Sequence, residues 1–283
     1  MVVSETDILK NIEMMDRGAE SIGTSITWHS LTHGGSWRPR NEDAHCISIE
    51  SEGEASSRYI LALADGLGSL HGGEIASQTA IKSINEEFHN WNGGSPDRFV
   101  VRAVRSANQE VYNAAHVNTE LANMQTTVTA VAVEQDTLAV GHVGDCRLYR
   151  IRGDQIELLT RDHSFASDLL SLHLISPEQV RQHPERNRLT RTVGSSPLLH
   201  VDVIRRKIIP DDIFVLCCDG LWSEVPEDAI KNIVQNADPV RACEELIELV
   251  LKGDALDNIT VIVFRIVKVG QRRSSLWQSF LRR

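Results

Sequence analysis

Apolar and polar residues alternate with a period of two along several stretches of this chain, which is the pattern of half-buried β-strands. The first three runs occupy residues 26–33, 43–50 and 58–65. Helical periodicity follows at 72–91 and 96–116, and the sequence NGGSP between them predicts a break, because glycine and proline interrupt helices. The pattern therefore predicts strands first and then a pair of helices.

The second half of the chain returns to strand patterns, again with helices in pairs. Two short helices are predicted within 164–188, divided near Ser176 and Pro177, and two more within 226–251. Because strands occur in runs and helices in pairs, we expect an α+β fold of two packed, largely antiparallel sheets with helices outside, in one domain. The remaining strands are expected at 126–134, 137–144, 146–151, after 155, and at 198–208, 213–220 and 258–267.

Composition narrows the class of protein. The chain has 283 residues, of which 41% are hydrophobic and 24% charged, as is typical of a globular protein. A formal net charge of −10 argues against nucleic-acid binding and leaves room for a cluster of acids that a cation neutralises. No apolar run reaches the roughly 18 residues of a membrane span, and no signal-peptide core is visible, so we expect a cytoplasmic protein.

The five cysteines show no paired spacing of the CxxC type, and three of them lie inside apolar, strand-like runs. We therefore expect buried, reduced thiols rather than disulfides or a zinc site. The five are Cys46, Cys146, Cys217, Cys218 and Cys243.

Aspartates recur where apolar strands meet turns. Asp65, Asp145 and Asp219 each follow an apolar run, whereas Asp43 and Asp257 come just before one. Strand ends converge on one edge of packed sheets, and carboxylates crowded there cannot all stay ionised without a cation. Oxygen ligands suit hard divalent ions such as magnesium or manganese, and the glycines after two of these aspartates allow sharp bends. The alternative is an unrelated α+β fold in which these are ordinary turn aspartates.

Eight stretches, in order, carry a resemblance to a known family: RPRNEDAH, LALADGLGSLHGGEIAS, TTVTAVAV, GHVGDCRLYR, LTRDHS, HPERNRLTRTVG, CCDGLW and DNITVIV. They resemble the metal-dependent serine/threonine protein phosphatases of the protein phosphatase 2C family, in a bacterial-type catalytic domain. The resemblance covers residues 25–267 and implies a central antiparallel β-sandwich flanked by helices on both faces. It divides the chain into a leader (1–24), a catalytic domain (25–268) and a basic tail (269–283).

The resemblance implies two core Mn²⁺ or Mg²⁺ ions at one edge of the sandwich. Asp65 resembles the acid that bridges both ions, and Asp219 and Asp257 resemble ligands of the second. The acids before the second strand act around the first ion, partly through water. The implied ligands of the core ions are Glu42, Asp43, Asp65, the Gly66 carbonyl, Asp219 and Asp257.

Three further features follow from the same resemblance. Arg38 matches the arginine that binds the substrate phosphate, a task that suits a planar guanidinium. Asp145 matches a ligand of a third, weaker metal ion in bacterial members. Residues 165–188 correspond to a variable flap, and His163 matches a motif beside the site, where we expect a structural hydrogen-bonding role.

The implied reaction is one-step hydrolysis of phosphoserine or phosphothreonine on a protein by a metal-activated water, reversing a bacterial serine/threonine kinase. Asp65, Asp219 and Arg38 are the expected catalytic residues. The protein is expected to be a monomer whose partners are the phosphoprotein and the kinase, with no nucleic acid and no membrane span. The second hypothesis is a catalytically weak, phosphatase-like protein that binds a phosphoprotein as a regulator or scaffold.

The turn after Asp65 departs from the family pattern. The family often has Asp-Gly-Met-Gly-Gly-His, whereas this chain reads DGLGSLHGG, with Ser69 and Leu70 in place of the glycine and histidine. Some members have a histidine general acid at the third position, where this chain has Leu67. The acid that protonates the leaving group is therefore unassigned, and His71 or a metal-bound water could serve.

Overall fold

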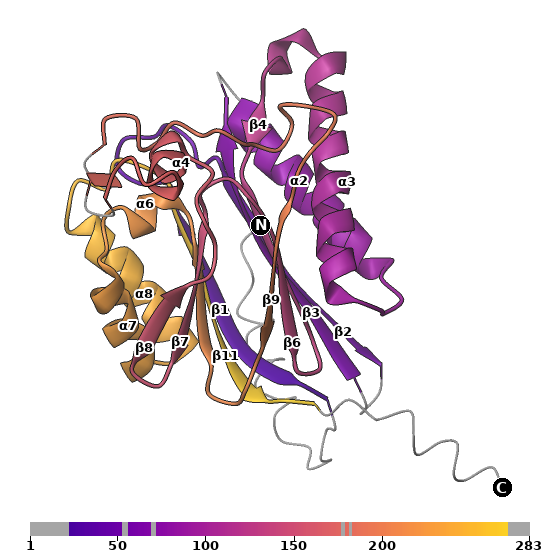
Figure 1. Cartoon of the computed structure of the whole chain (residues 1–283), viewed down its shortest axis with the longest axis vertical. Helices are drawn as coiled ribbons and strands as arrows, with labels where there is room; N and C mark the ends of the chain where they lie inside the picture. The colour runs from indigo at the N-terminus through magenta and orange to yellow at the C-terminus, as the bar shows by residue number, and fades with distance from the viewer. Residues whose placement is uncertain (1–22, 53–55, 69–71, 177–178, 181–182, 271–283) are drawn as a thin grey trace, which may run out of the picture.

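Two antiparallel sheets pack face to face in this protein, with helices on both outer faces (Figure 1). The structure is a computed structural model that describes residues 23–52, 56–68, 72–176, 179–180 and 183–270. Within these residues, no helix is both long enough and apolar enough to cross a membrane.

The first sheet has five strands in the order β1-β11-β10-β7-β8. Every pairing within it is antiparallel, and β11, the last strand that the structure describes, lies inside the sheet between β1 and β10. Its strands are β1 (Ser25–His33), β7 (Arg147–Arg152), β8 (Gln155–Leu158), β10 (Ile213–Cys217) and β11 (Ile259–Lys268).

The second sheet has the order β2-β3-β5-β6-β9, and the short strand β4 pairs with β3 outside this path. The antiparallel register of β2 and β3 places Asp43 directly opposite Asp65. Its strands are β2 (Asp43–Glu52), β3 (Ser56–Leu67), β4 (Gln125–Thr126), β5 (Val128–Glu134), β6 (Thr137–Val143) and β9 (Asp202–Lys207).

The helices form two outer layers, and local sequence fixes several of their ends. α2 (Gly72–His89) and α3 (Pro96–Val117) cover the second sheet, and proline opens α3, where its missing N–H is not needed. α7 (Glu227–Asn236) and α8 (Pro239–Leu251) cover the first sheet. The short elements are η2 (Thr119–Leu121), α4 (Phe165–Ser171) and α6 (Asp219–Trp222).

Three apolar clusters hold the four layers together. One lies between α2, α3 and the second sheet, another between the first sheet and α6–α8, and the third fills the space between the sheets. In this central cluster the rings of Phe214 and Phe264 stack 4.8 Å apart. The five cysteines are free thiols; Cys46 is half-buried and the other four are buried, as predicted from their apolar surroundings.

The predicted α+β sandwich with helices on both faces is confirmed, but several local predictions are wrong. The strand expected at 198–208 begins only at Asp202. The strand expected to end at Asp65 continues to Leu67 as β3, and Asp219, expected within a strand at 213–220, is the first residue of α6. Part of the second helix expected within 164–188, the leader residues 1–22 and the tail residues 271–283 lie outside the described residues, and the predicted domain boundaries stay a prediction.

Candidate metal centre

Asp43 and Asp65 form the middle of the candidate site, opposite each other on neighbouring strands. The backbone of Asp65 is fixed from the β4–β5 segment. Its N–H donates to Thr127 Oγ1 at 3.0 Å, and its carbonyl accepts from the Thr127 N–H and from Thr126 Oγ1, both at 2.8 Å. With the main chain held at both its donor and its acceptor, the Asp65 carboxyl has a defined position next to Asp43.

One oxygen of Asp43 has a protein partner and the other has none. Thr260 on β11 donates its hydroxyl to Asp43 Oδ2 at 2.6 Å. Asp43 Oδ1 is buried and has no hydrogen-bond partner within the part of the chain that the structure describes. A buried carboxylate oxygen without a partner is costly, so this atom fits a bound cation.

Asp219 and Asp145 approach the same place from other strand ends, after β10 and β6 respectively. Burial, and then the charge of Asp257, raise the pKa of Asp219 to about 6. Burial is also the main cause that raises the pKa of Asp43 to about 7, with Asp219 and Asp257 adding to it. Burial and the charges of the neighbouring aspartates hold the pKa values of Asp65 and Asp145 well above the usual range. The cluster therefore carries more negative charge than its surroundings compensate.

Asp257 stands at the rim, immediately before β11, and pairs with Arg38. The Arg38 guanidinium donates to Asp257 Oδ2 at 2.8 Å, and this hydrogen bond is the main reason that the pKa of Arg38 is raised. The Arg38 side chain is 48% exposed, so its cationic head lies at the mouth of the acidic cluster, accessible from solvent. The structure therefore brings the predicted phosphate-binding arginine and a predicted metal ligand into direct contact.

The side chain of Asn258 joins the loop before β2 to the start of β11. Its Oδ1 accepts from the Glu42 N–H at 2.8 Å, and its Nδ2 donates to the carbonyls of Gly34 and Arg40 at 2.9 and 3.0 Å. Burial is the main cause that raises the pKa of Glu42, against the lowering effect of Arg38. Asn258 thus connects the two segments that carry Arg38, Glu42 and Asp257.

The two glycines that follow aspartates are required by close packing rather than by a sharp bend. A Cβ at Gly66 would lie 2.0 Å from the carbonyl oxygen of Gly73, and a Cβ at Gly220 would lie 2.0 Å from that of Asn258. Neither glycine has a positive φ. The Gly66 N–H donates to the Glu42 carbonyl at 3.1 Å, which ties β3 to the residue before β2.

Asp145 has its own set of neighbours at the side of the cluster. Its carbonyl accepts from Trp222 Nε1 at 2.9 Å, and the Arg147 guanidinium lies 3.7 Å from the centre of the Trp222 ring. Arg147 is bound by both oxygens of Asp162, at 3.1 and 2.7 Å. Asp162 takes the Arg147 guanidinium, and the attraction of Arg147 lowers the pKa of Asp145 less than burial and the charge of Asp219 raise it.

His163 makes hydrogen bonds on both sides of its ring, as its predicted structural role requires. Its Nδ1 accepts from the Gly144 N–H at 3.0 Å, so Nε2 is the nitrogen that can carry a proton toward Asp202, 3.1 Å away. The His163 backbone N–H also donates to the Gly144 carbonyl at 2.7 Å. His163 therefore holds the residue next to Asp145 from two directions.

Within the described residues, no three His, Cys, Asp or Glu side chains converge closely enough to enclose an ion by themselves. This arrangement agrees with magnesium-type binding, in which one or two carboxylates hold an ion that keeps several waters. Oxygen donors, the partnerless Asp43 Oδ1 and the uncompensated charge all fit divalent cations of that kind.

The structure brings Asp43, Asp65, Asp145 and Asp219 near one another, whereas the acid that protonates the leaving group stays unassigned. Ser69, Leu70 and His71 lie outside the described residues. Sequence reasoning missed Thr260 and Asn258, which hold Asp43 and the Glu42 segment. Both are polar residues at or just before the start of the otherwise apolar strand β11. This contrast in polarity is the sequence signal that could have indicated their role in the site.

This architecture, a two-sheet α+β sandwich with aspartates gathered near its strand ends, suits a protein that binds divalent cations. A family profile described as "Protein phosphatase 2C" matches residues 39–250. The chain belongs to the protein phosphatase 2C family, as its sequence motifs predict.

Bacterial proteins named as serine/threonine phosphatases are similar to this chain. The serine/threonine protein phosphatase PstP of Mycobacterium tuberculosis is 31% identical over 208 residues, which span 74% of this chain and 40% of that protein. The crystal structure of Stp1 from Staphylococcus aureus has a TM-score of 0.81 at 29% identity, covering 88% of this chain and 98% of that one. A structure of the PstP catalytic domain in complex with two manganese ions has a TM-score of 0.76 at 28% identity, covering 87% and 100%.

Proposed function

We propose that this chain is a metal-dependent protein phosphatase that hydrolyses phosphoserine and phosphothreonine on proteins. The observation that carries the proposal is the group of Asp43, Asp65, Asp145 and Asp219, of which Asp145 is buried and the others half-buried, and in which the buried Asp43 Oδ1 has no partner among the described residues. Such a group needs cations to be fully ionised. The two manganese ions in the related PstP structure support the same number of core ions here.

The proposed ligands divide between the strand ends as the family resemblance suggests. Asp65 and Gly66 lie near the end of β3, Asp43 faces Asp65 from the start of β2, Asp219 opens α6 and Asp257 lies before β11. Asp145 would serve a third ion. Ions held there would neutralise phosphoryl charge and lower the pKa of water, so that hydroxide is available near neutral pH.

Arg38 is the proposed phosphate-binding residue. Its guanidinium is half exposed at the mouth of the cluster, so it can donate two parallel hydrogen bonds to phosphate oxygens. Its present partner, Asp257, is also a proposed metal ligand. A metal ion on Asp257 would therefore free Arg38 to turn toward the substrate.

The overall reaction cleaves the bond between phosphorus and the serine or threonine oxygen and adds water. Hydroxide attacks phosphorus, the leaving oxygen takes a proton, and inorganic phosphate and the free hydroxyl residue result. The four cysteines in the core are buried, and burial raises the pKa of Cys217 and Cys218, so neither is suited to act as a thiolate nucleophile. No phosphoenzyme is required.

The cellular setting is part of the same proposal. The chain acts as a monomer in the cytoplasm on phosphoproteins, and a serine/threonine kinase supplies its substrates. The names of the related bacterial serine/threonine phosphatases support the class of substrate in this setting.

The decisive experiment measures hydrolysis of p-nitrophenyl phosphate and a phosphothreonine peptide. We expect turnover only with added manganese or magnesium, and its loss with a chelator. Full activity in a strong chelator would exclude the metal-dependent mechanism. Tight phosphopeptide binding in manganese without turnover would instead favour the regulator or scaffold hypothesis.

A further inference from the structure

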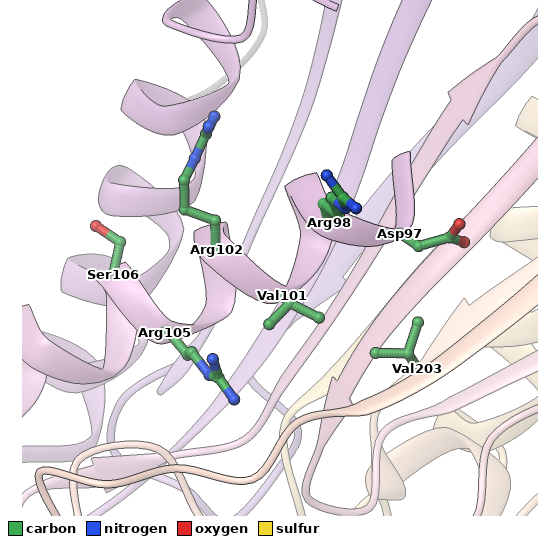
Figure 2. A pocket seen from close by; sticks show the side chains of 7 residues that line it. All are labelled: Asp97, Arg98, Val101, Arg102, Arg105, Ser106 and Val203. Atoms are coloured by element: carbon green, nitrogen blue, oxygen red, sulfur yellow. The ribbon is translucent and has the colours of Figure 1, made fainter. Parts of the chain in front are cut away.

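An open hollow of about 690 Å³ lies between α3 and the edge strand β9, apart from the acidic cluster (Figure 2). Val101 of α3 and Val203 of β9 face each other across it, and Arg98, Arg102 and Arg105 extend from successive turns of the helix. β9 is the third neighbour of β3, which places it about 14 Å away at the usual strand spacing. The hollow is therefore not part of the candidate metal centre.

Two of these arginines have no carboxylate partner among the residues that the structure describes, although the chain has 39 acidic residues. Arg102 donates to Glu87 at 2.8 Å, and Asp97 at the rim is taken by Arg205 at 3.1 Å. Within the described parts of the chain, neither Arg98 nor Arg105 makes an ion pair or a side-chain hydrogen bond, and both are exposed. Most other described arginines do pair with a carboxylate, among them Arg38, Arg40, Arg58, Arg147, Arg150, Arg152 and Arg191.

The spacing of the arginines is unfavourable for the helix itself. Arg98 and Arg102 are four residues apart and Arg102 and Arg105 three apart, so like charges lie on one face of α3. Glu87 neutralises the charge of Arg102, but no carboxylate in the described structure neutralises Arg98 or Arg105. An anion bound from outside the chain would reduce this repulsion.

The floor of the hollow selects the class of anion. Val203 is 45% exposed and Val101 is half-buried, so the floor can take an apolar side chain. No aromatic side chain on which a base could stack lines the described hollow, and the net charge of −10 opposes broad contact with nucleic acid or an anionic membrane. A short acidic peptide with an apolar residue at its centre satisfies both the cations and the valines.

We propose that the hollow between α3 and β9 binds an acidic segment of a partner protein, with carboxylates on Arg98 and Arg105 and one apolar side chain between Val101 and Val203. Seven residues of helix separate the two arginines by about 10 Å. About three residues of extended peptide span that distance. The matching segment therefore has acidic residues on both sides of a single apolar one.

The test measures binding of a fluorescein-labelled peptide with the central sequence Glu-Glu-Leu-Glu-Glu by fluorescence anisotropy, with the full chain at low salt. We expect saturable binding that weakens with added salt, because the ion pairs are exposed. R98E/R105E should weaken it at least about tenfold. The matched control K252E/K268E changes the net charge equally at exposed lysines elsewhere and should keep the affinity within about twofold.

A charge-swapped peptide, Lys-Lys-Leu-Lys-Lys, should bind R98E/R105E more tightly than the wild type. Unchanged affinity in R98E/R105E, or equal binding when serine replaces the leucine, would overturn the proposal. Arginine-dependent binding of heparin or of anionic lipid vesicles that exceeds peptide binding would overturn it too. If the glutamate pair fails to fold, judged by circular dichroism, R98Q/R105Q takes its place.

These measurements do not depend on turnover. Hydrolysis of p-nitrophenyl phosphate should be the same in R98E/R105E as in the wild type, because neither arginine belongs to the acidic cluster. Lost peptide binding with intact turnover supports this docking surface. Absent turnover with intact peptide binding would count against the phosphatase proposal alone.

Discussion

Asp43 and Asp65 lie directly opposite each other in the register of β2 and β3, and both residues are half-buried. Facing residues on neighbouring antiparallel strands have Cβ atoms about 5 Å apart, and like charges at that distance destabilise a sheet. After burial, Asp43 is the strongest influence that raises the pKa of Asp65. Repulsion between these two carboxylates therefore lowers the stability of the folded protein, and a divalent ion bound between them would offset that repulsion.

Asp65→Asn should abolish turnover while keeping the fold. The amide removes a central ligand charge but can keep the position of the side chain, so we expect at least about a hundredfold loss of kcat/KM. Manganese titration calorimetry on the same sample should show loss of the tight sites. Near-normal turnover would place the bridging ligand elsewhere.

The metal-free protein should become less stable as the pH rises from about 4 to about 7. An unfolded aspartate has a pKa near 3.9, whereas folded Asp43 and Asp219 titrate at about 7 and about 6. Across that window the native state binds protons that the unfolded state has lost, so the free energy of unfolding falls with pH by up to about 1.4 kcal/mol per unit for each group. Denaturation in chelator at pH 5 and pH 8 measures this.

Manganese should reverse most of that loss at pH 8, because it binds the ionised carboxylates of the native state. Asp65→Asn should also flatten the pH dependence in chelator. A metal-free protein that gains stability between pH 5 and pH 8 would contradict the raised pKa values.

Arg38→Ala should raise KM for a phosphopeptide more than it lowers kcat, because the phosphate is present in the ground state. Arg40→Ala is the matched control, since Arg40 lies two residues away, is similarly exposed and pairs with Glu74. Steady-state kinetics in saturating manganese compares the two. Equal effects of both substitutions would place Arg38 outside the substrate site.

Asp145→Ala should keep the two tight ions and sharply reduce phosphopeptide turnover. An ion held by few carboxylates and several waters is expected to be weak, so calorimetry should lose only the weak phase. Asp154→Ala, at an exposed aspartate on the nearby β7–β8 turn, should change neither quantity. Loss of the tight ions in Asp145→Ala would assign Asp145 to the core pair.

Asn258→Ala should destabilise the protein by about 1–3 kcal/mol or more, because it leaves the Glu42 N–H and two carbonyls without their partner. Manganese affinity should fall as well, since Glu42 and Asp257 lose their common support. Asn236→Ala removes a single bond at an exposed helix end and should stay within about 0.5 kcal/mol. Chemical denaturation decides between these outcomes.

The sheets could be predicted because alternation of apolar and polar residues fixes which face of a strand is buried. The run at 26–33 became β1 (Ser25–His33), and the closing run became β11. The strand predicted at 198–208 is too long at its start. Pairing with β6 covers only Asp202 to Lys207, so the residues before Asp202 have no strand partner in β6. A period of two indicates a strand but does not name its partner.

The acids of the site could be predicted as a group, but their arrangement could not. Convergence of strand ends at one edge follows from packing two sheets, and Asp65, Asp145 and Asp219 lie near enough for their charges to raise one another's pKa values. The opposition of Asp43 and Asp65 depends on strand register, and the pairing of Arg38 with Asp257 joins residues 219 positions apart. Contacts of that range leave no periodic signal in the sequence.

β11 is the last strand of the described residues, yet it occupies an interior place in its sheet, between β1 and β10. A ribosome releases the chain from the N-terminus, so both neighbours are complete before the strand that joins them has been made. Until then two unpaired strand edges are open to other chains. A stop codon shortly before residue 257 would therefore give an aggregation-prone product rather than a partly active enzyme, and late nonsense mutations should be as damaging as early ones.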